Sequence, residues 1–373
     1  MSPAPAAEIP VRPQRRDLEA AGITIEHWLR RHLVAAGALR VTGVSTPDSA
    51  GVANETLMVE TQGGPGGSGK YVVRVDSEDH LFLGMDLGVH YRMYRQLGTV
   101  PGVPVPATYG FEVDRSILGD RFFVMEWVEG QVPSDRPNFN REGWLKERPE
   151  ADREAIWRNV IGMMARFHAL EPGDFAFLAR PALGPSGLEQ EMRHWLRYAD
   201  WCSADRSALL ADARCWLTDH FPDDPPTALS WGDARLQNIM VRGTECVAMF
   251  DWDMVSLAGP EADLAWWALA DHKYTYSRGL DRLTGIGSPA ATIALWEQIS
   301  GRKARDMDWH LIFAAYRQAL VSVRLPELTR RLQGLSRDEH RSIPASAGLQ
   351  WLSCLLDKPL GEPLTTPFVG LDR

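Results

Sequence analysis

The chain has 373 residues, a formal net charge of −9, a hydrophobic fraction of 45% and a charged fraction of 24%. This composition is typical of a globular protein of about two domains, and it excludes wholesale disorder. A chain this acidic is not attracted as a whole to nucleic acid or to anionic lipid, so neither is expected as a partner.

The sequence carries no signal for export or for a membrane. The N-terminus lacks a cationic stretch followed by an apolar run, and no apolar run approaches the ~20 residues that a membrane span needs. The 4 cysteines are scattered and form no CxxC pair, which disfavours a zinc or redox site and fits a reducing compartment. We therefore expect a cytoplasmic protein, and nothing in the sequence indicates an oligomeric state.

The N-terminal third alternates between helical and strand patterns. Residues 1–16 are rich in Pro, Ala and Arg and are expected to form a loose arm. A helix is predicted over 24–36, with Thr24 as its cap, because apolar residues share one face there. Strands and one further helix follow, predicted at 41–45, 56–61, 71–75, 87–98 (helix), 107–113 and 121–128.

One glycine-rich segment imitates a phosphate-binding loop. Residues 64–70 read GPGGSGK, but Tyr71 stands where that motif needs Ser or Thr, and a strand pattern follows instead of a helix. We expect a hairpin turn here.

After Gly130 the pattern becomes mainly helical. Helices are predicted at 156–168, 187–200, 205–219, 261–270, 306–325 and 336–356, with a short hairpin over 239–250. The layout is an α+β fold of two lobes. A small antiparallel β-sheet lobe with a leading helix covers 17–129, a hinge lies near 126–130, and a larger helical lobe covers 130–373.

Three side chains in the second lobe point to chemistry. Asp233 follows a short apolar strand, Asn238 stands at the mouth of the predicted hairpin, and Asp251 comes just after its second strand. A hairpin returns the chain to its starting edge, so Asn238 and Asp251 are expected to converge. Such a pair suits Mg²⁺, which prefers few protein oxygens together with waters and phosphate oxygens. Each residue taken alone is more often a turn former or a cap.

The stretch around these residues resembles a known family. W-G-D-x4-N at 231–238 and F-D-W-D at 250–253 are similar to the H-G-D-x4-N and I-D-W-E/D motifs of the aminoglycoside phosphotransferase and choline-kinase-like superfamily, relatives of the protein kinases. GPEADLAWW at 259–267 resembles the family's D-P-x-x-D-L-A segment. The resemblance implies a two-lobed protein-kinase-like fold.

The resemblance also implies roles for the central residues. Asp233 would orient a substrate hydroxyl and accept its proton, and Asn238 and Asp251 would hold Mg²⁺ against the phosphates of ATP. Arg235 would stabilise the transferring phosphoryl group, a surface salt bridge being the alternative. Asp263 would brace the loop by hydrogen bonds.

Further roles follow for the first lobe. VMEWVEG at 124–130 resembles the strand and hinge that hold adenine, so Glu126 and Val128 would offer backbone groups. GVANET at 51–56 is similar to the family's G-x-S-N-x-T turn, which makes Gly51 and Asn54 expected phosphate contacts. Arg74 stands where a Lys normally binds the α- and β-phosphates.

The sequence departs from the family at three positions. Trp231 replaces the usual His before Gly-Asp, Arg74 replaces Lys, and His90 aligns with the Glu that normally pairs with that Lys. Glu78 or Asp86 could substitute as the carboxylate partner of Arg74.

Two functions from different classes follow. The first is an ATP- and Mg-dependent kinase acting on a hydroxyl of a small molecule. The alternative is a nucleotide-binding pseudokinase that regulates a partner, motivated by the three departures. A protein kinase is disfavoured because no activation loop ending in A-P-E follows Asp251.

The substrate stays open between an aminoglycoside, a hydroxy acid, a sugar and an amino alcohol. An aminoglycoside is a polycation and would favour an acidic pocket. Candidate carboxylates lie among aromatic residues of the second lobe, with solvated helix faces as the alternative: Glu189, Glu191, Asp200, Asp205 and Asp271. His168 and the pair Trp266 and Trp267 are expected in the core.

Overall fold

The computed structural model describes residues 16–33, 38–47, 54–64, 67–77, 79–202, 204, 207–332 and 346–360. These residues form two compact units. The first comprises the described residues within 1–91, 108–127 and 324–341, and the second comprises those within 92–107, 128–323 and 342–373. The chain therefore passes from one unit to the other between Trp127 and Val128, and the helices α2 and α10 each contribute residues to both units.

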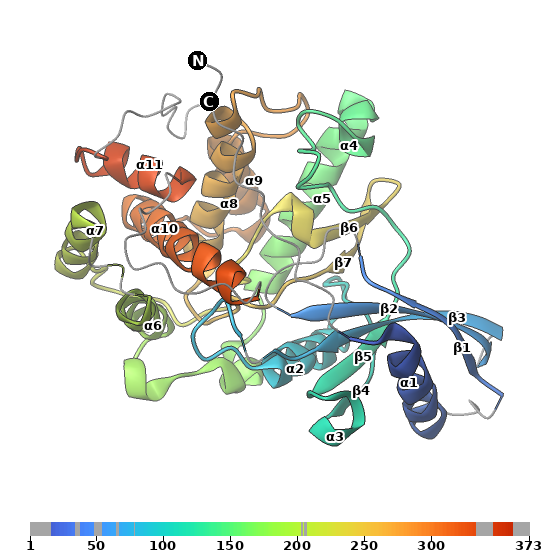
Figure 1. Cartoon of the computed structure of the whole chain (residues 1–373). Coiled ribbons are helices and arrows are strands. Elements are labelled where there is room, and N and C mark those ends of the chain that lie inside the picture. The colour runs from blue at the N-terminus through green and yellow to red at the C-terminus, as the bar shows by residue number, and fades with distance from the viewer. Residues whose placement is uncertain are drawn as a thin grey trace, which may run out of the picture. The chain divides into compact units, whose positions relative to one another are not determined.

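The first unit is built on a five-stranded antiparallel sheet in the order β1-β2-β3-β5-β4 (Figure 1). Its elements are α1 (Leu18–His32), β1 (Arg40–Ser45), β2 (Glu55–Gly64), β3 (Gly67–Val75), β4 (Thr108–Glu112), α3 (Arg115–Leu118) and β5 (Phe122–Glu126). The glycine-rich segment joins β2 to β3 as a hairpin, and Lys70 lies inside β3 paired with Glu60. The expected hairpin is confirmed.

The core of the first unit lies between α1 and the sheet. Ile25, Trp28 and Leu29 share one face of α1 and are fully buried. They pack with alternate residues of the central strands, as the period of two along a strand requires: Leu57, Val59, Val73, Val75, Phe122 and Val124. Burying each such side chain contributes roughly 1.5–3 kcal/mol, so this face of the sheet fixes the register of the strands.

The first helix begins earlier than its apolar pattern predicts. Asp17 caps it, because its Oδ1 accepts hydrogen bonds from the backbone N–H of Glu19 (3.0 Å) and Ala20 (3.1 Å). The predicted cap Thr24 lies inside the helix and donates from Oγ1 to the Ala20 carbonyl at 3.1 Å. The expectation of a helix starting at Thr24 was wrong, because a carboxylate cap further upstream satisfies the first free N–H groups.

The second unit is mainly helical. Besides the hairpin of β6 (Ile239–Arg242) and β7 (Glu245–Met249), it contains α4 (Trp144–Glu147), α5 (Glu150–His168), α6 (Gly187–Trp201), α7 (Ala208–Asp219), α8 (Pro260–Tyr274), α9 (Pro289–Ser300) and α11 (Ala347–Leu355). The two shared helices are α2 (Leu87–Leu97) and α10 (Met307–Leu332). The strand β7 and the helix α9 both pack against α5 (Figure 1).

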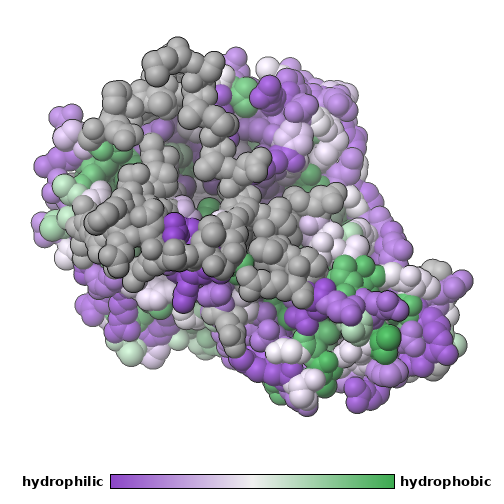
Figure 2. Space-filling model, viewed as in Figure 1, coloured by the Kyte–Doolittle hydropathy of each residue, from purple (hydrophilic) through white to green (hydrophobic). Residues whose placement is uncertain are grey.

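Tryptophan fills much of the interior of the second unit. Five of its tryptophans rank among the largest fully buried side chains: Trp195, Trp231, Trp252, Trp296 and Trp351. On the face shown in Figure 2 the coloured residues are mostly hydrophilic, with apolar residues in small groups. Within the described residues, no helix is both long and apolar enough for a membrane crossing.

Buried histidines make stability sensitive to acid. Burial lowers the pKa of His310 to about 3, and that of His272 to about 4. An unfolded chain binds a proton at these side chains from about pH 6.5 downward. The stability that these neutral side chains contribute is therefore fully present above pH ~6.5. It is lost as the pH falls from there toward the pKa of the histidines in the folded protein.

We expect His310→Leu to flatten this acid loss. Each neutral buried histidine costs up to about 1.4 kcal/mol of unfolding free energy per pH unit below its unfolded pKa. Urea unfolding at several pH values from about 4 to about 7 gives the unfolding free energy at each pH, and hence the slope. The same replacement at the exposed His27 is the control, and an unchanged slope in His310→Leu would contradict the assignment.

Candidate functional site

The centre of the site is the loop that carries Asp233. Ser230 forms a β-bridge with Ser256, and the chain then turns at Gly232, whose φ is +94°. A Cβ atom on Gly232 would lie 2.0 Å from the Met254 carbonyl oxygen, so only glycine fits this turn. The turn delivers Asp233 to the start of a short 3-10 helix, Leu236–Asn238, that leads into β6.

Both carboxylate oxygens of Asp233 accept hydrogen bonds. Oδ1 accepts from Trp266 Nε1 at 2.6 Å, and Oδ2 accepts from Asn238 Nδ2 and from Arg235 Nε, both at 2.8 Å. Burial alone would raise the pKa of Asp233, but the Arg235 charge and the three donors outweigh it and hold the pKa below its usual value. Asp233 is therefore a carboxylate at neutral pH.

The hairpin brings Asn238 and Asp251 together, as its strand register predicts. Ile239 pairs with Met249, and the backbone N–H of Phe250 donates to the Asn238 carbonyl at 3.0 Å. Asp251 is the next residue, and its φ of +62° places it in the left-handed region that side chains other than glycine rarely adopt. Aspartate enters this region more readily than most residues, and Asp306 (φ +52°) and Asp357 (φ +50°) of this chain do so as well.

The donors present fit a magnesium ion. Asn238 uses Nδ2 toward Asp233, which leaves its Oδ1 as the oxygen that the side chain can offer a cation. Together with the Asp251 carboxylate this gives two hard oxygen ligands, and Mg²⁺ completes its octahedron with waters and substrate phosphates. In the described part of the chain, no cluster of three or more His, Cys, Asp or Glu side chains offers an alternative all-protein metal site.

Arg235 lies in a network of acidic and phenolic oxygens. Besides Asp233, its Nη1 donates to both oxygens of Asp135 and to the Tyr274 hydroxyl, each at 3.0 Å. Burial alone would lower the pKa of Arg235, but the surrounding acidic groups raise it well above its usual value. The Arg235 side chain is 19% exposed and the Asp135 side chain is 39% exposed, so Arg235 is largely shielded from water while its outer partner faces solvent.

The fully buried carboxylate of Asp263 holds the loop that carries Asp233. Asp263 on α8 accepts from the backbone N–H of Trp231 (2.6 Å) and Gly232 (2.7 Å), from the Ser230 hydroxyl (2.9 Å), and from His168 Nε2 (2.8 Å). The expected bracing by Asp263 is confirmed. His168 Nδ1 accepts from Trp296 Nε1 at 3.0 Å, so the proton of the His168 ring is on Nε2. His168 is thus the hydrogen-bonded core residue that its apolar helix face predicted.

Trp231 links two segments of the site by hydrogen bonds. Its indole Nε1 donates to the carbonyl oxygens of Phe250 (2.8 Å) and Asp251 (3.1 Å). The ring is fully buried and lies against Trp252, with a distance of 6.3 Å between ring centroids. The indole N–H therefore ties the Asp233 loop to the segment carrying Asp251.

Arg74, which is predicted to contact the phosphates, belongs to the first unit. Arg74 lies on β3 and donates from Nη1 to Thr56 Oγ1 on β2 at 3.0 Å. No carboxylate in the described residues forms an ion pair with Arg74, and Asp86, one candidate partner, pairs with Arg121 at 3.1 Å. Glu78, the other candidate, lies outside the described residues.

Asn54, Glu126, Val128 and Gly51 are the other residues predicted to contact the nucleotide. The Asn54 side chain is buried, and neither its Nδ2 nor its Oδ1 has a hydrogen-bond partner in the described structure. Glu126 is the last residue of β5 and is exposed. Val128, two residues on, is half-buried and begins the main segment of the second unit. Gly51 lies outside the described residues.

Three residues that contact Asp233 or Arg235 were not predicted as part of the site. Asp135 and Tyr274 lie far from the motif in sequence, and no spacing rule connects them to it. Trp266 could have been found, because it follows Asp263 by three positions on α8 and therefore shares the helix face that meets the loop. Trp266 is a core residue as expected, and its indole N–H also bonds the central carboxylate.

The comparisons with known proteins agree on the fold. The chain is similar over 89% of its length to a provisional aminoglycoside phosphotransferase from Ralstonia eutropha, at 23% identity, a TM-score of 0.59 and 94% coverage of that protein. It is also similar to the ADP-bound aminoglycoside phosphotransferase APH(2'')-Ib, at 12% identity and a TM-score of 0.50, over 91% of this chain and 97% of that one. At these identities the likeness concerns the fold alone.

The sequence relatives are longer proteins. Acyl-CoA dehydrogenase family member 11 of Homo sapiens is 23% identical over 329 residues, which cover 85% of this chain and 40% of that protein. The acyl-CoA dehydrogenase IBR3, assigned as probable in Arabidopsis thaliana, is 25% identical over 232 residues, covering 58% of this chain and 26% of that protein. The chain thus spans at most about two fifths of the curated relatives it matches.

A family model identifies the protein family of this chain. It is described as the phosphotransferase enzyme family, and it matches residues 45–301, which include the described strands β2 to β7 and the loop of Asp233. These residues are more than half of the chain, and the five-stranded sheet and the helical unit are the architecture that the sequence motifs predicted. The chain belongs to the phosphotransferase enzyme family.

Proposed function

We propose that this protein is a kinase that transfers the γ-phosphoryl group of ATP to a hydroxyl group of a small molecule. The observation that carries the proposal is the convergence of Asp233, Asn238 and Asp251 on one loop and hairpin. Solved structures of the same fold support the nucleotide, since one is described with ADP and another with ATP and streptomycin, the latter at a TM-score of 0.50.

In this proposal Asp233 accepts the proton of the acceptor hydroxyl. Its low pKa makes it a weak base, which suits a loose phosphoryl transition state in which positioning matters more than basicity. Trp266, Asn238 and Arg235 hold the carboxylate in one orientation. Arg235 supplies positive charge beside the reacting centre, and Asp135 holds its guanidinium in place.

Magnesium would be held by Asn238 Oδ1 and by the Asp251 carboxylate. When bound, the ion neutralises charge on the phosphate oxygens. We further propose that residues 17–129 supply the nucleotide contacts, through Arg74, Asn54 and the backbone of Glu126 and Val128, and that Gly51 contributes to the same turn. Residues 130–373 would carry the catalytic loop and the acceptor site.

The competing function is a nucleotide-binding pseudokinase that regulates a partner. It is favoured by one observation, the lack of a described carboxylate partner for Arg74. The ordered Asp233 loop favours the kinase, because a site without catalysis would not need a carboxylate held by three donors.

Metal dependence tests the proposal directly. ATP turnover is expected to require Mg²⁺ and to stop when EDTA is added. Asp251→Asn is expected to lower turnover by about 10²–10³-fold, since one charged ligand stabilises the transferring group by several kcal/mol. Turnover is measured as ADP release over a Mg²⁺ titration. Asp253→Asn, two residues on, is the matched control with a smaller loss, and Mg²⁺-independent turnover would contradict the assignment.

A further inference from the structure

Arg317 on α10 is a buried arginine of the second unit that contacts the Asp233 loop. The residue is 1% exposed, and its Nη2 donates to the Gly232 carbonyl at 3.2 Å. Asp263 accepts from the backbone N–H of the same glycine at 2.7 Å, so two buried side chains of opposite charge hold both backbone groups of Gly232. Because Gly232 directly precedes Asp233, these contacts help to set the direction in which the Asp233 side chain leaves the loop.

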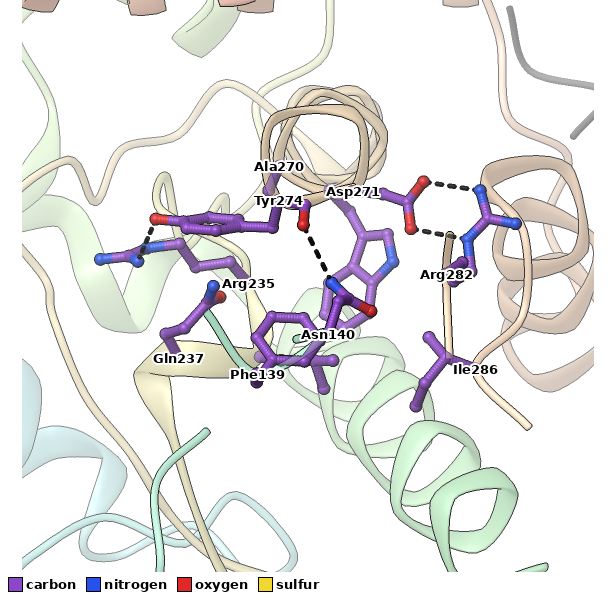
Figure 3. Close-up of a pocket in the computed structure, with 11 residues that line it drawn as sticks. Phe139, Asn140, Arg235, Gln237, Ala270, Asp271, Tyr274, Arg282 and Ile286 are labelled. Atoms are coloured by element: carbon purple, nitrogen blue, oxygen red, sulfur yellow. Dashed lines mark hydrogen bonds and ion pairs between the residues drawn. The ribbon is translucent and has the colours of Figure 1, made fainter. Parts of the chain in front are cut away.

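Arg317 differs from two other arginines that lie near α8. Arg282 donates two hydrogen bonds to Asp271 of α8, at 2.7 and 2.6 Å, as Figure 3 shows, and Arg235 donates to Asp233 at 2.8 Å. Within the described part of the chain, no carboxylate forms an ion pair with Arg317, and its Nε has no hydrogen-bond partner. A buried charge without a direct ion pair is costly, so other groups must stabilise it.

Aromatic rings surround the guanidinium group of Arg317. Its Cζ lies 4.9 Å from the ring centroid of Trp266, 5.2 Å from that of Trp195 and 5.5 Å from that of Phe313. The negative face of an aromatic ring attracts a cation that lies within ~6 Å of the ring centroid. Three aromatic rings thus take the place of a direct ion pair.

The two indoles beside Arg317 each donate a hydrogen bond to a carboxylate. Trp266 Nε1 donates to Asp233 Oδ1 at 2.6 Å, and Trp195 Nε1 donates to Glu191 Oε1 at 2.8 Å. A cation, an indole and a carboxylate therefore follow one another in the same order twice. The positive charge draws electron density from the indole ring, which makes its N–H a stronger donor.

The electrostatic interactions of Arg317 agree with this arrangement. Burial lowers the pKa of Arg317, and the charges of Glu191, Asp263 and Asp233 act in the opposite direction. The side chain remains charged at neutral pH, because the usual pKa of arginine is so high. Attraction between two charges is mutual, so Arg317 also stabilises the ionised form of Asp233.

We propose that Arg317 is a positioning residue for Asp233. Its charge strengthens the hydrogen bond from Trp266 to Asp233 Oδ1, and its Nη2 fixes the Gly232 carbonyl, so that the carboxylate is held in one orientation for the proton transfer. The catalytic part of this inference rests on the proposed function. The effect of Arg317 on the Trp266 N–H is independent of turnover.

Two substitutions separate the charge of Arg317 from its hydrogen bond. Arg317→Gln keeps a planar amide donor and removes the charge, whereas Arg317→Lys keeps the charge and loses the planar fork. We expect kcat of Arg317→Gln to fall ~10–10²-fold at a nearly unchanged KM for ATP, because a misdirected carboxylate affects the transition state more than nucleotide binding. Arg317→Lys is expected to lose no more than ~5-fold. Turnover is measured as ADP release from MgATP.

The indole N–H of Trp266 reports the interaction without turnover. Its proton–nitrogen NMR signal in the full chain is assigned by its disappearance in Trp266→Phe. We expect the signal to move upfield in Arg317→Gln, as the hydrogen bond weakens, and to stay near its wild-type position in Arg317→Lys. Arg158→Gln is the control, because this exposed arginine lies 5.6 Å from the ring centroid of Trp157, whose N–H donates to the Thr292 hydroxyl.

Urea unfolding of each variant shows whether the fold persists. Should Arg317→Gln not fold, Trp266→Phe tests the same connection, because it keeps an aromatic ring beside Arg317 and removes the N–H that bonds Asp233. Its kcat is expected to fall ~10-fold at an unchanged KM for ATP. A wild-type kcat in Trp266→Phe would overturn the proposal.

The remaining results distinguish this inference from the function beneath it. A wild-type kcat and an unmoved Trp266 signal in Arg317→Gln would overturn the role of Arg317, and so would equal losses in Arg317→Gln and Arg317→Lys. The predicted changes of the Trp266 signal, in a protein that releases no ADP from MgATP, would overturn the kinase function and leave the connection between Arg317 and Asp233 standing.

Discussion

Replacing Asp233 by asparagine is expected to reduce phosphoryl transfer by about 10²–10⁴-fold, the usual contribution of a positioned proton acceptor. The loss has two physical causes. An amide cannot accept the hydroxyl proton, and all three neighbours of Asp233 are donors, so the new NH₂ group faces another N–H wherever it points. The measurement is the single-turnover rate at saturating MgATP, compared with wild type.

Asp135→Asn is the matched control for this substitution. It also removes a carboxylate from Arg235, but it leaves Asp233 and its three donors in place. We expect its rate to fall by no more than ~10-fold, because charge near the centre changes while the proton acceptor stays. Equal losses in the two variants would show that Asp233 acts only by balancing Arg235.

Acidity provides an independent check on the same residue. The pKa of Asp233 is held below the usual value of a carboxyl group, so the side chain remains ionised when the pH falls from neutral. The interactions that lower this pKa stabilise the fold above the unfolded pKa, near 3.9, and are lost below it. The pH dependence of turnover near neutrality is therefore not expected to report Asp233.

Replacing Asp263 by alanine is expected to lower the free energy of unfolding by about 3–5 kcal/mol, the cost of removing one member of a buried charged network. Four donors lose their acceptor at once, among them two backbone N–H groups of the Asp233 loop. Asp263 and His168 are both buried, so water does not replace the carboxylate without local opening. Urea unfolding followed by tryptophan fluorescence gives the difference.

Trp296→Phe serves as the graded control. It removes only the N–H that donates to His168 Nδ1, and we expect a loss of about 1 kcal/mol with nearly normal turnover. If Asp263→Ala were no less stable than Trp296→Phe, the loop would not depend on the carboxylate. A fully folded Asp263→Ala with wild-type turnover would contradict its positioning role.

A contact of the site could be predicted from the sequence when its residues lie close together along the chain. The pairing of Asn238 with the segment of Asp251 was predictable because a hairpin register is a local property. The contacts of Asp135 and Tyr274 with Arg235 were not, since they depend on how distant segments pack. No periodicity or motif encodes such contacts.

The fold also contains elements that the sequence pattern predicts and elements that it does not. The strands were predicted within a few residues because β-branched residues and turns mark them clearly. The helix α9 was missed although Ser288 caps it, Pro289 opens it and Gly301 ends it with a φ of +69°. Its mixed alanine and threonine content hides the apolar stripe, so the end signals deserved more weight than the periodicity. The prediction over 336–356 holds only for Ala347–Leu355, and residues 336–345 lie outside the described part of the chain.

The indole at position 231 has a chemical consequence that an imidazole would not share. A histidine ring donates from a given nitrogen in only one of its neutral tautomers, and it acquires a charge within the physiological range of acidity. The nitrogen of Trp231 carries its hydrogen permanently, with Phe250 and Asp251 as acceptors. The hydrogen bonds that tie the Asp233 loop to the segment of Asp251 are consequently the same in weakly acidic and weakly basic surroundings, because no proton has to be gained or lost to form them.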